Sequence, residues 1–140
     1  MTRSSLQKLA GLSMQGHAEL WLDPLGNEAT TSDCTISVYD KGFDYTWSHE
    51  GKPQRGHLEL NPGGAEWSDT WHQPQPMECT TVPESWSIVD VIGTYAAGEG
   101  PAWGWRISLS ERPGGELVLQ MTNVAPWGER ARAVRMVATV

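Results

Sequence analysis

The sequence has few cysteines, few basic residues and no long apolar run. Its 140 residues include two cysteines, Cys34 and Cys79, too few for a disulfide scaffold and without the spacing of a metal-binding pair. Because 17 Asp and Glu residues outnumber 10 Lys and Arg residues, the charge argues against nucleic acid or an anionic membrane as partner. No segment approaches the roughly 20 apolar residues of a membrane helix, and the first residues lack the apolar core of a signal peptide. We therefore expect a cytoplasmic protein.

The common enzyme signatures are also absent. The sequence contains no Gly-x-Ser-x-Gly elbow, no phosphate-binding glycine loop and no His-Glu-x-x-His pair. The histidines are His17, His49, His57 and His72. They fall on different predicted strands and mostly on different faces, so no metal site is predicted. We expect no cofactor, and the sequence favours a binding protein while leaving an enzyme open.

What the sequence does contain is alternation of apolar and polar residues, which predicts strands. The clearest strand covers residues 43–49, where Phe43, Tyr45, Trp47 and His49 share one face. Further strands are predicted over residues 14–22, 33–39, 57–60, 65–71, 77–81, 86–95, 103–109, 117–123 and 131–140, with turn residues between them. A short helix is predicted before them, because Leu6 and Leu9 form one apolar stripe and Gly11 can end the helix.

About ten strands with short connections favour an antiparallel meander, because parallel strands would need crossover helices. A meander of this length must either close on itself or split into two packed sheets, and closure removes the unpaired edges. We therefore predict one all-β domain over residues 1–140, a roughly ten-stranded up-and-down antiparallel barrel with a short N-terminal helix. The alternative is a β-sandwich.

Four short motifs carry a resemblance to a known family. They are LQKLAG at 6–11, which leads into a first strand with Gly16, WSDTWH at 67–72, GPAWGWRI at 100–107 and MTNVAP at 121–126. In these motifs the chain resembles a lipocalin-like (calycin) barrel, and more specifically a family of small bacterial barrels distantly akin to the haem-binding nitrobindins. Two departures matter: Met14 stands where calycins usually have Trp, and no histidine follows His72 to hold haem. The resemblance therefore implies the barrel but not haem binding.

Eight tryptophans against one phenylalanine are an unusual aromatic composition. If the strands turn their apolar faces inward, the barrel interior receives many of these tryptophans together with a few polar groups. The candidate ligand-binding residues are Tyr45, Trp47, His49, Trp67, Asp69, Trp71, Trp103, Trp105 and Asn123. A mostly apolar pocket with a few convergent polar groups is the usual design of a small-molecule site. We predict that a small apolar or aromatic molecule binds there; the alternative is a filled barrel with a structural hydrogen-bond network.

Asp69 is the most informative of these candidates. Trp67 and Trp71 share its face, while the opposite face is polar, so Asp69 is predicted to lie inside with them. A buried carboxylate must accept hydrogen bonds, and His49, Asn123, a tryptophan N–H or a ligand are the expected donors. A contact between Asp69 and His49 would provide a general acid–base pair. The alternative function is therefore a small cyclase or isomerase with His49 and Asp69 as catalytic residues.

Several other residues carry simpler expectations. His72 stands at a predicted strand end and is expected in solvent. Arg106 faces outward by alternation and is expected to form a structural ion pair, and Cys34 is expected to be an inert core thiol. Trp21 and Trp86 are expected on outward faces, which leaves a homodimer as a further hypothesis.

Overall fold

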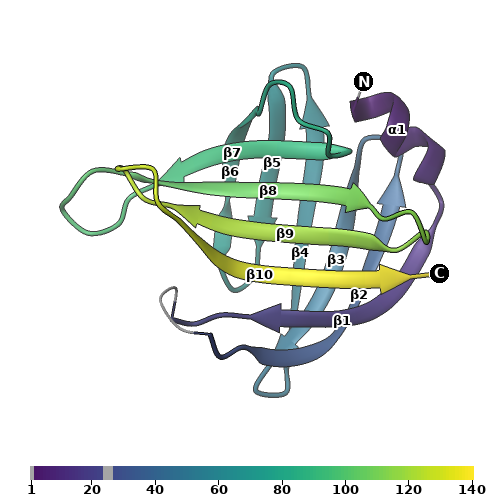
Figure 1. The fold of residues 1–140 in the computed structure, drawn as a ribbon, viewed down its shortest axis with the longest axis horizontal. Helices are drawn as coiled ribbons and strands as arrows, with labels where there is room; N and C mark the ends of the chain where they lie inside the picture. The colour runs from purple at the N-terminus through teal and green to yellow at the C-terminus, as the bar shows by residue number, and fades with distance from the viewer. Residues whose placement is uncertain (1, 24–26) are drawn as a thin grey trace.

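The protein is a closed barrel of ten antiparallel strands, seen in a computed structural model that describes residues 2–23 and 27–140 (Figure 1). The elements are α1 (Thr2–Leu9), β1 (Ser13–Leu20), β2 (Thr30–Tyr39), β3 (Gly42–His49), β4 (Lys52–Asn61), β5 (Gly64–Asp69), β6 (Gln73–Thr81), β7 (Val89–Tyr95), β8 (Trp103–Glu111), β9 (Leu117–Val124) and β10 (Arg130–Thr139). Each strand pairs with its neighbour in the sequence, and β1 pairs with β10 to close the barrel. The barrel is confirmed, and the sandwich is not formed.

The pairing of β1 with β10 explains why the first strand contains Gly16. β1 and β10 pair from Gln15 with Thr139 to Leu20 with Val134. A Cβ at Gly16 would lie 1.8 Å from the carbonyl oxygen of Val137. Only glycine therefore permits the close backbone approach at this point of the seam.

The backbone pairing between neighbouring strands is not equally continuous around the barrel. β6 and β7 are joined by only two residue pairs, Thr80 with Ile92 and Thr81 with Val91. By contrast, β7 and β8 are paired along the whole of β7, from Val89 to Tyr95. The first half of β6 contains Pro74 and Pro76, which have no N–H to donate to a neighbouring strand.

One end of the barrel is closed by α1. The side chains of Leu6 and Leu9 are buried in the hydrophobic core. The segment after α1 is tied to the end of β2, because the Gly11 N–H donates to the Val38 oxygen at 2.8 Å and the Val38 N–H donates to the Leu12 oxygen at 3.0 Å. In Figure 1 the helix lies across the ends of the strands, near the C-terminus of the chain. No helix in residues 2–23 or 27–140 is long and apolar enough to cross a membrane.

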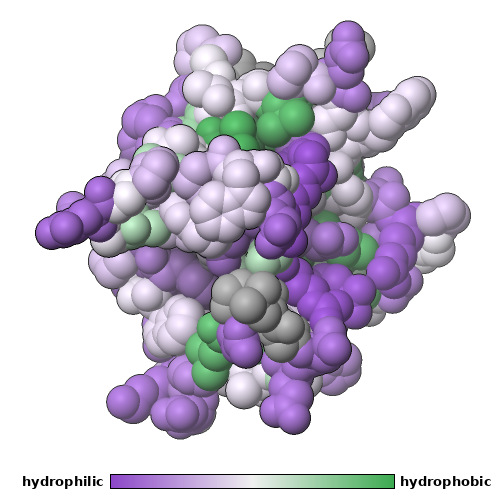
Figure 2. Space-filling model, turned by 60° about the vertical axis from the view of Figure 1, so that its left-hand side comes forward, coloured by the Kyte–Doolittle hydropathy of each residue, from purple (hydrophilic) through white to green (hydrophobic). Residues whose placement is uncertain are grey.

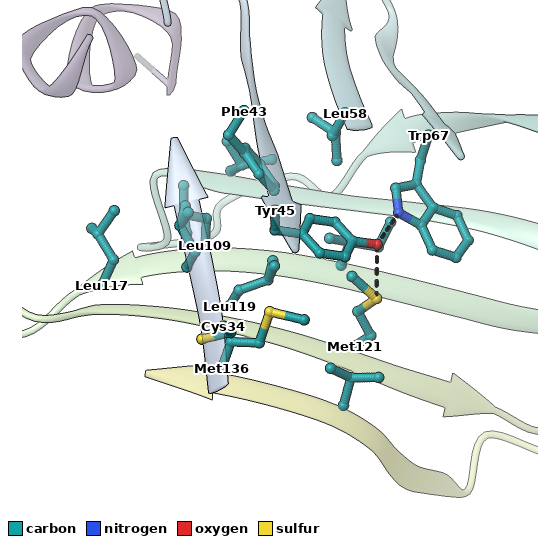
Figure 3. Packing of buried hydrophobic residues seen from close by; sticks show 14 of the residues in the cluster. Cys34, Phe43, Tyr45, Leu58, Trp67, Leu109, Leu117, Leu119, Met121 and Met136 are labelled. Carbon is teal, nitrogen blue, oxygen red and sulfur yellow. Dashed lines mark hydrogen bonds between the residues drawn. The ribbon is translucent and has the colours of Figure 1, made fainter. Parts of the chain in front are cut away.

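The half of the barrel next to α1 is filled by side chains. These are large apolar residues with no exposed surface, among them Ile36, Phe43, Leu58, Leu109, Leu117, Leu119 and Met136. Figure 3 shows several of them converging from strands on opposite sides of the barrel. The filled half is a conventional hydrophobic core. Space inside the barrel is therefore confined to the other end.

Two of the simpler expectations concern single side chains and are confirmed. The Arg106 guanidinium donates to both carboxylate oxygens of the buried Asp90, at 2.8 and 2.7 Å, and this bidentate hydrogen bonding raises the pKa of Arg106.

Burial raises the pKa of the Cys34 thiol to about 11, helped by the charge of Asp33. The thiol is therefore protonated at neutral pH and a poor nucleophile.

The expectation for the two outward tryptophans is half right. Trp86 is fully exposed, whereas Trp21 is only 8% exposed, so the prediction for Trp21 is wrong. β1 ends at Leu20, and strand alternation no longer applies one residue later. Instead the Trp21 backbone N–H donates to the Ala133 oxygen at 2.9 Å, and the Arg132 guanidinium covers the indole ring at 4.5 Å.

Candidate functional site

A cavity of about 260 Å³ lies at the end of the barrel opposite α1. Its lining comes from seven strands or the segments next to them: Trp21, Leu22, Trp67, Trp71, His72, Gln73, Met77, Tyr95, Trp105, Asn123 and Ala133. Figure 2 brings this end of the barrel toward the viewer, where hydrophilic and neutral residues predominate and strongly hydrophobic ones form small separate patches. The exposed large apolar side chains near this end include Leu22, Trp71 and Trp127.

Stacked aromatic rings form the wall of the cavity. Trp67 and Trp105 are stacked, with ring centroids 5.4 Å apart and planes 17° apart. Tyr95 meets Trp105 edge-on at 6.4 Å, and its hydroxyl donates to Asn123 Oδ1 at 2.5 Å. These contacts hold the rings in fixed positions, and they give the cavity flat apolar faces.

Asp69 lies beneath this wall and is only 2% exposed, so its predicted burial is confirmed. Its Oδ2 accepts hydrogen bonds from the Tyr45 hydroxyl at 2.6 Å and from Trp47 Nε1 at 3.3 Å. Its Oδ1 accepts the backbone N–H groups of Trp71 and His72 at 2.8 and 2.9 Å. A tryptophan N–H was among the expected donors, and that prediction is also confirmed.

Tyr45 is the link between this carboxylate and the core. Its hydroxyl accepts a hydrogen bond from Trp67 Nε1 at 3.0 Å and lies 4.0 Å from the Met121 sulfur (Figure 3). Burial raises the pKa of Tyr45 well above its ordinary value, and the charge of Asp69 raises it further. The hydroxyl is therefore neutral, and its proton is directed to Asp69.

The ionisation of Asp69 follows from its partners. Burial alone would raise the pKa of this carboxyl, but the nearby His72 imidazole and the hydrogen bonds from the Tyr45 hydroxyl and the His72 backbone N–H outweigh burial and hold the pKa below its usual value. Asp69 is therefore a carboxylate at neutral pH. Because no described Lys or Arg pairs with it, its charge is stabilised by hydrogen-bond donors and by the nearby imidazole of His72.

Asp69 also ends β5 and changes the direction of the chain. The sequence predicts a strand over 65–71, but the register shifts between Trp67 and Asp69, and the strand stops at Asp69. The carboxylate then accepts the N–H groups of the next turn, a common way for aspartate to stop a strand. As a result Trp71 moves toward the rim and is 40% exposed, and the His72 side chain is only 12% exposed. The expectation of a solvated His72 is therefore wrong.

His72 occupies the place that the sequence assigned to His49. Its ring lies within 4.7–5.5 Å of the rings of Trp47, Trp71 and Trp105, and its Nδ1 is 3.4 Å from Asp69 Oδ1. His49 instead contacts Trp71 at 5.4 Å and Glu50 at 3.8 Å. The donors to Asp69 do not include it, so the predicted contact between His49 and Asp69 is wrong.

The remaining predicted site residues divide into three groups. Trp67, Trp71, Trp105 and Asn123 line the cavity. Tyr45, Trp47 and Asp69 form the hydrogen-bonded layer beneath it. His49 and Trp103 are not part of the lining that the structure describes, and Trp103 packs edge-on against Trp127 at 5.5 Å. Sequence reasoning missed Trp21, His72, Met77 and Tyr95, although the spacing Asp69-x-x-His72 before Gln73-Pro74 is a turn signal.

Three buried nitrogens near the cavity have no hydrogen-bond partner among the described residues. They are Trp21 Nε1, His72 Nδ1 and Trp105 Nε1, and all three residues contribute to the lining. The contact of His72 Nδ1 with Asp69 is within ion-pair distance but is not an aligned hydrogen bond. Buried polar atoms are normally satisfied by protein, water or ligand, so this concentration of unmatched nitrogens marks the cavity as an unusual part of the interior.

No family model and no curated protein matches the chain. The closed ten-stranded barrel is compatible with a lipocalin-like fold. Among the described residues, no group of three or more His, Cys, Asp or Glu side chains is arranged to hold a metal ion. The site must therefore be interpreted from its own geometry.

Gly56 provides a test of the layer beneath the cavity. It pairs with Tyr45 on one side and Asp69 on the other, and a Cβ at this position would lie 2.0 Å from Tyr45 Cζ and 2.2 Å from the hydroxyl. We expect Gly56→Ala to displace the hydroxyl from Asp69 and to lower the free energy of unfolding by about 1–3 kcal/mol. Urea denaturation measures the change. Gly63→Ala, where a Cβ meets nothing within 4 Å, is the control, and equal stabilities of the two variants would contradict the prediction.

The lowered pKa of Asp69 predicts a pH dependence of stability. Because the folded-state pKa lies below the unfolded value of about 3.9, ionised Asp69 stabilises the fold above about pH 4, and this contribution is lost as the pH falls through the folded-state value. We expect Asp69→Asn to be less stable than the natural protein by about 1–3 kcal/mol at neutral pH. The difference in unfolding free energy between the natural protein and Asp69→Asn should become smaller below about pH 4, as measured by urea titrations.

The control for this experiment is Asp33→Asn, because the Asp33 side chain is 98% exposed. Its stability should follow that of the natural protein at every pH. If the stability difference between Asp69→Asn and the natural protein stays constant down to about pH 2, the carboxylate charge does not stabilise the fold.

Proposed function

We propose that the protein binds a small, mostly apolar aromatic molecule in the cavity opposite α1. The observation that carries this proposal is the cavity of about 260 Å³ whose wall contains the stacked Trp67 and Trp105. Apolar walls with a few polar groups are typical of small-molecule sites. Flat indole faces favour a flat ligand, because aromatic rings gain from offset or edge-on packing.

The size and charge of the cavity limit the ligand further. Sites for drug-sized molecules usually measure roughly 300–1,000 Å³, so this cavity suits a molecule of one or two rings. The lining includes His72, Gln73, Tyr95 and Asn123 as polar residues and has no Lys, Arg, Asp or Glu among its described members. A charged ligand would have to leave water without a partner of opposite charge. A neutral ligand fits this lining better.

Equilibrium dialysis with naphthalene tests the proposal, with limonene, laurate, quercetin and haem as comparison compounds. We expect naphthalene to bind and Trp105→Phe to weaken its binding about tenfold, since the variant removes part of the stacked wall. The matched control is Trp86→Phe, because Trp86 is fully exposed and away from the lining. Absence of binding by every compound, or equal weakening in both variants, would contradict the proposal.

A second candidate function is proton transfer on a bound carbonyl compound, the chemistry of an isomerase. It is favoured by the placement of His72 between the cavity and the Asp69 carboxylate, with 3.4 Å between Nδ1 and Oδ1. In such a pair the carboxylate orients the imidazole, and the imidazole takes a proton from carbon. The proton moves from the carbon beside the carbonyl to the imidazole, and the enolate that forms takes a proton back.

Deuterium exchange into 2-tetralone, a two-ring ketone, tests this second candidate. In D₂O the protein should speed the exchange of the protons beside the carbonyl above the buffer rate, as followed by NMR. His72→Asn should reduce the excess rate by at least about a hundredfold, the usual contribution of a general base. His17→Asn, whose side chain is 86% exposed in the natural protein, should leave the rate unchanged. Exchange at the buffer rate would remove this candidate.

A further inference from the structure

We infer that the ligand of the cavity carries an O–H or N–H group that donates a hydrogen bond to His72 Nε2, as a hydroxylated aromatic molecule would. This inference rests on the proposed binding function and specifies its ligand. It follows from the protonation of the imidazole, which the Asp69 carboxylate determines.

The first step concerns the proton on the imidazole. His72 Nδ1 lies 3.4 Å from Oδ1 of the ionised Asp69. A bare Nδ1 would direct its lone pair at an oxygen that carries negative charge, whereas a protonated Nδ1 directs its N–H there. A ring with a single proton therefore carries it on Nδ1. Nε2 is then an acceptor.

The second step is that neither group can easily turn away. Four donors hold the Asp69 carboxylate: the Tyr45 hydroxyl, Trp47 Nε1 and the backbone N–H groups of residues 71 and 72. The imidazole ring is enclosed by Trp47, Trp71 and Trp105. Rotation of either group would break these hydrogen bonds or ring contacts, so the orientation of the imidazole relative to the carboxylate is fixed by the surroundings.

The third step concerns the surroundings of His72 Nε2. No described residue forms a hydrogen bond with this atom, and Nε2, unlike Nδ1, is not among the buried atoms that lack a partner. His72 contributes to the cavity lining, so Nε2 is the nitrogen available to a bound molecule. An acceptor buried by a ligand that cannot donate to it would lose its hydrogen bond to water. The site therefore selects a ligand with a donor.

The rest of the cavity agrees with a hydroxylated ring. Trp21 and Trp105 each carry a buried N–H without a partner, and a hydroxyl oxygen can accept a hydrogen bond while its proton is donated elsewhere. Asn123 Oδ1 already accepts the Tyr95 hydroxyl. A hydroxyl group on a flat aromatic ring would therefore combine a donor for His72 with an apolar body for the indole wall.

Three matched compounds test this inference by equilibrium dialysis: naphthalene, 2-naphthol and 2-methoxynaphthalene. The last two have an oxygen at the same position, but only 2-naphthol can donate. We expect 2-naphthol to bind about tenfold more tightly than 2-methoxynaphthalene. This is the ratio of dissociation constants expected when one ligand donates a hydrogen bond to Nε2 and the other leaves Nε2 without one. His72→Asn keeps an amide N–H for Asp69 but has no atom at Nε2, so the tenfold preference should disappear while naphthalene still binds. His17→Asn should retain the preference.

The outcomes distinguish the inference from the function on which it rests. Equal binding of 2-naphthol and 2-methoxynaphthalene, or an unchanged preference in His72→Asn, would overturn the inference and leave aromatic binding intact. Binding of none of the three compounds would overturn both. ¹⁵N NMR of the natural protein gives a measurement that needs no variant: Nδ1 of His72 should carry a proton, and Nε2 should be bare. A proton on Nε2 would overturn the inference.

Discussion

The structure depends on a carboxylate that is buried without a basic residue among its described hydrogen-bond donors. Removing Asp69 from water is costly, and four hydrogen-bond donors are needed to offset the cost. Two of these donors are side chains of β3, and two are backbone groups of the turn after β5. Gly56 on β4, which lies between these strands, leaves the space that the Tyr45 ring fills. One ionised group thus determines side-chain choices on three neighbouring strands.

The same carboxylate marks the boundary between the filled and the open part of the barrel. On the α1 side, Tyr45 continues into a core of leucine, phenylalanine and methionine side chains. On the other side, the turn held by Asp69 brings Trp71 and His72 to the cavity, where Trp67 and Trp105 are stacked. The polar layer therefore serves as the floor of the cavity, and its charge is separated from the cavity by the ring of His72.

Most of the fold could be predicted from the sequence, because period-two alternation and short turns leave few arrangements for so many strands. The burial of Asp69 could be predicted as well, since its two tryptophan neighbours would otherwise expose an apolar patch. The errors lie at or beyond strand ends, and two of them concern His49, which ends β3, and Trp103, which begins β8. Trp21 follows β1 by one residue, and Trp71 and His72 follow β5 by two and three. Alternation has no meaning there, and the turn that places His72 is set by a side-chain hydrogen bond that the pattern does not show.

The unequal ladders around the barrel have a mechanical consequence. Where β6 and β7 share only two residue pairs, few hydrogen bonds resist separation of the two strands. Met77 of β6 belongs to the cavity lining, and it packs where a Cβ at Gly93 of β7 would lie 2.5 Å from its sulfur. The barrel therefore resists deformation less at the junction of β6 and β7 than at the junction of β8 and β9, where pairing is continuous. A molecule larger than the resting cavity would enlarge it by moving this flexible methionine side chain and parting the loosely joined strands. Such parting would also separate the stacked indoles, because Trp67 on β5 and Trp105 on β8 lie on opposite sides of this junction.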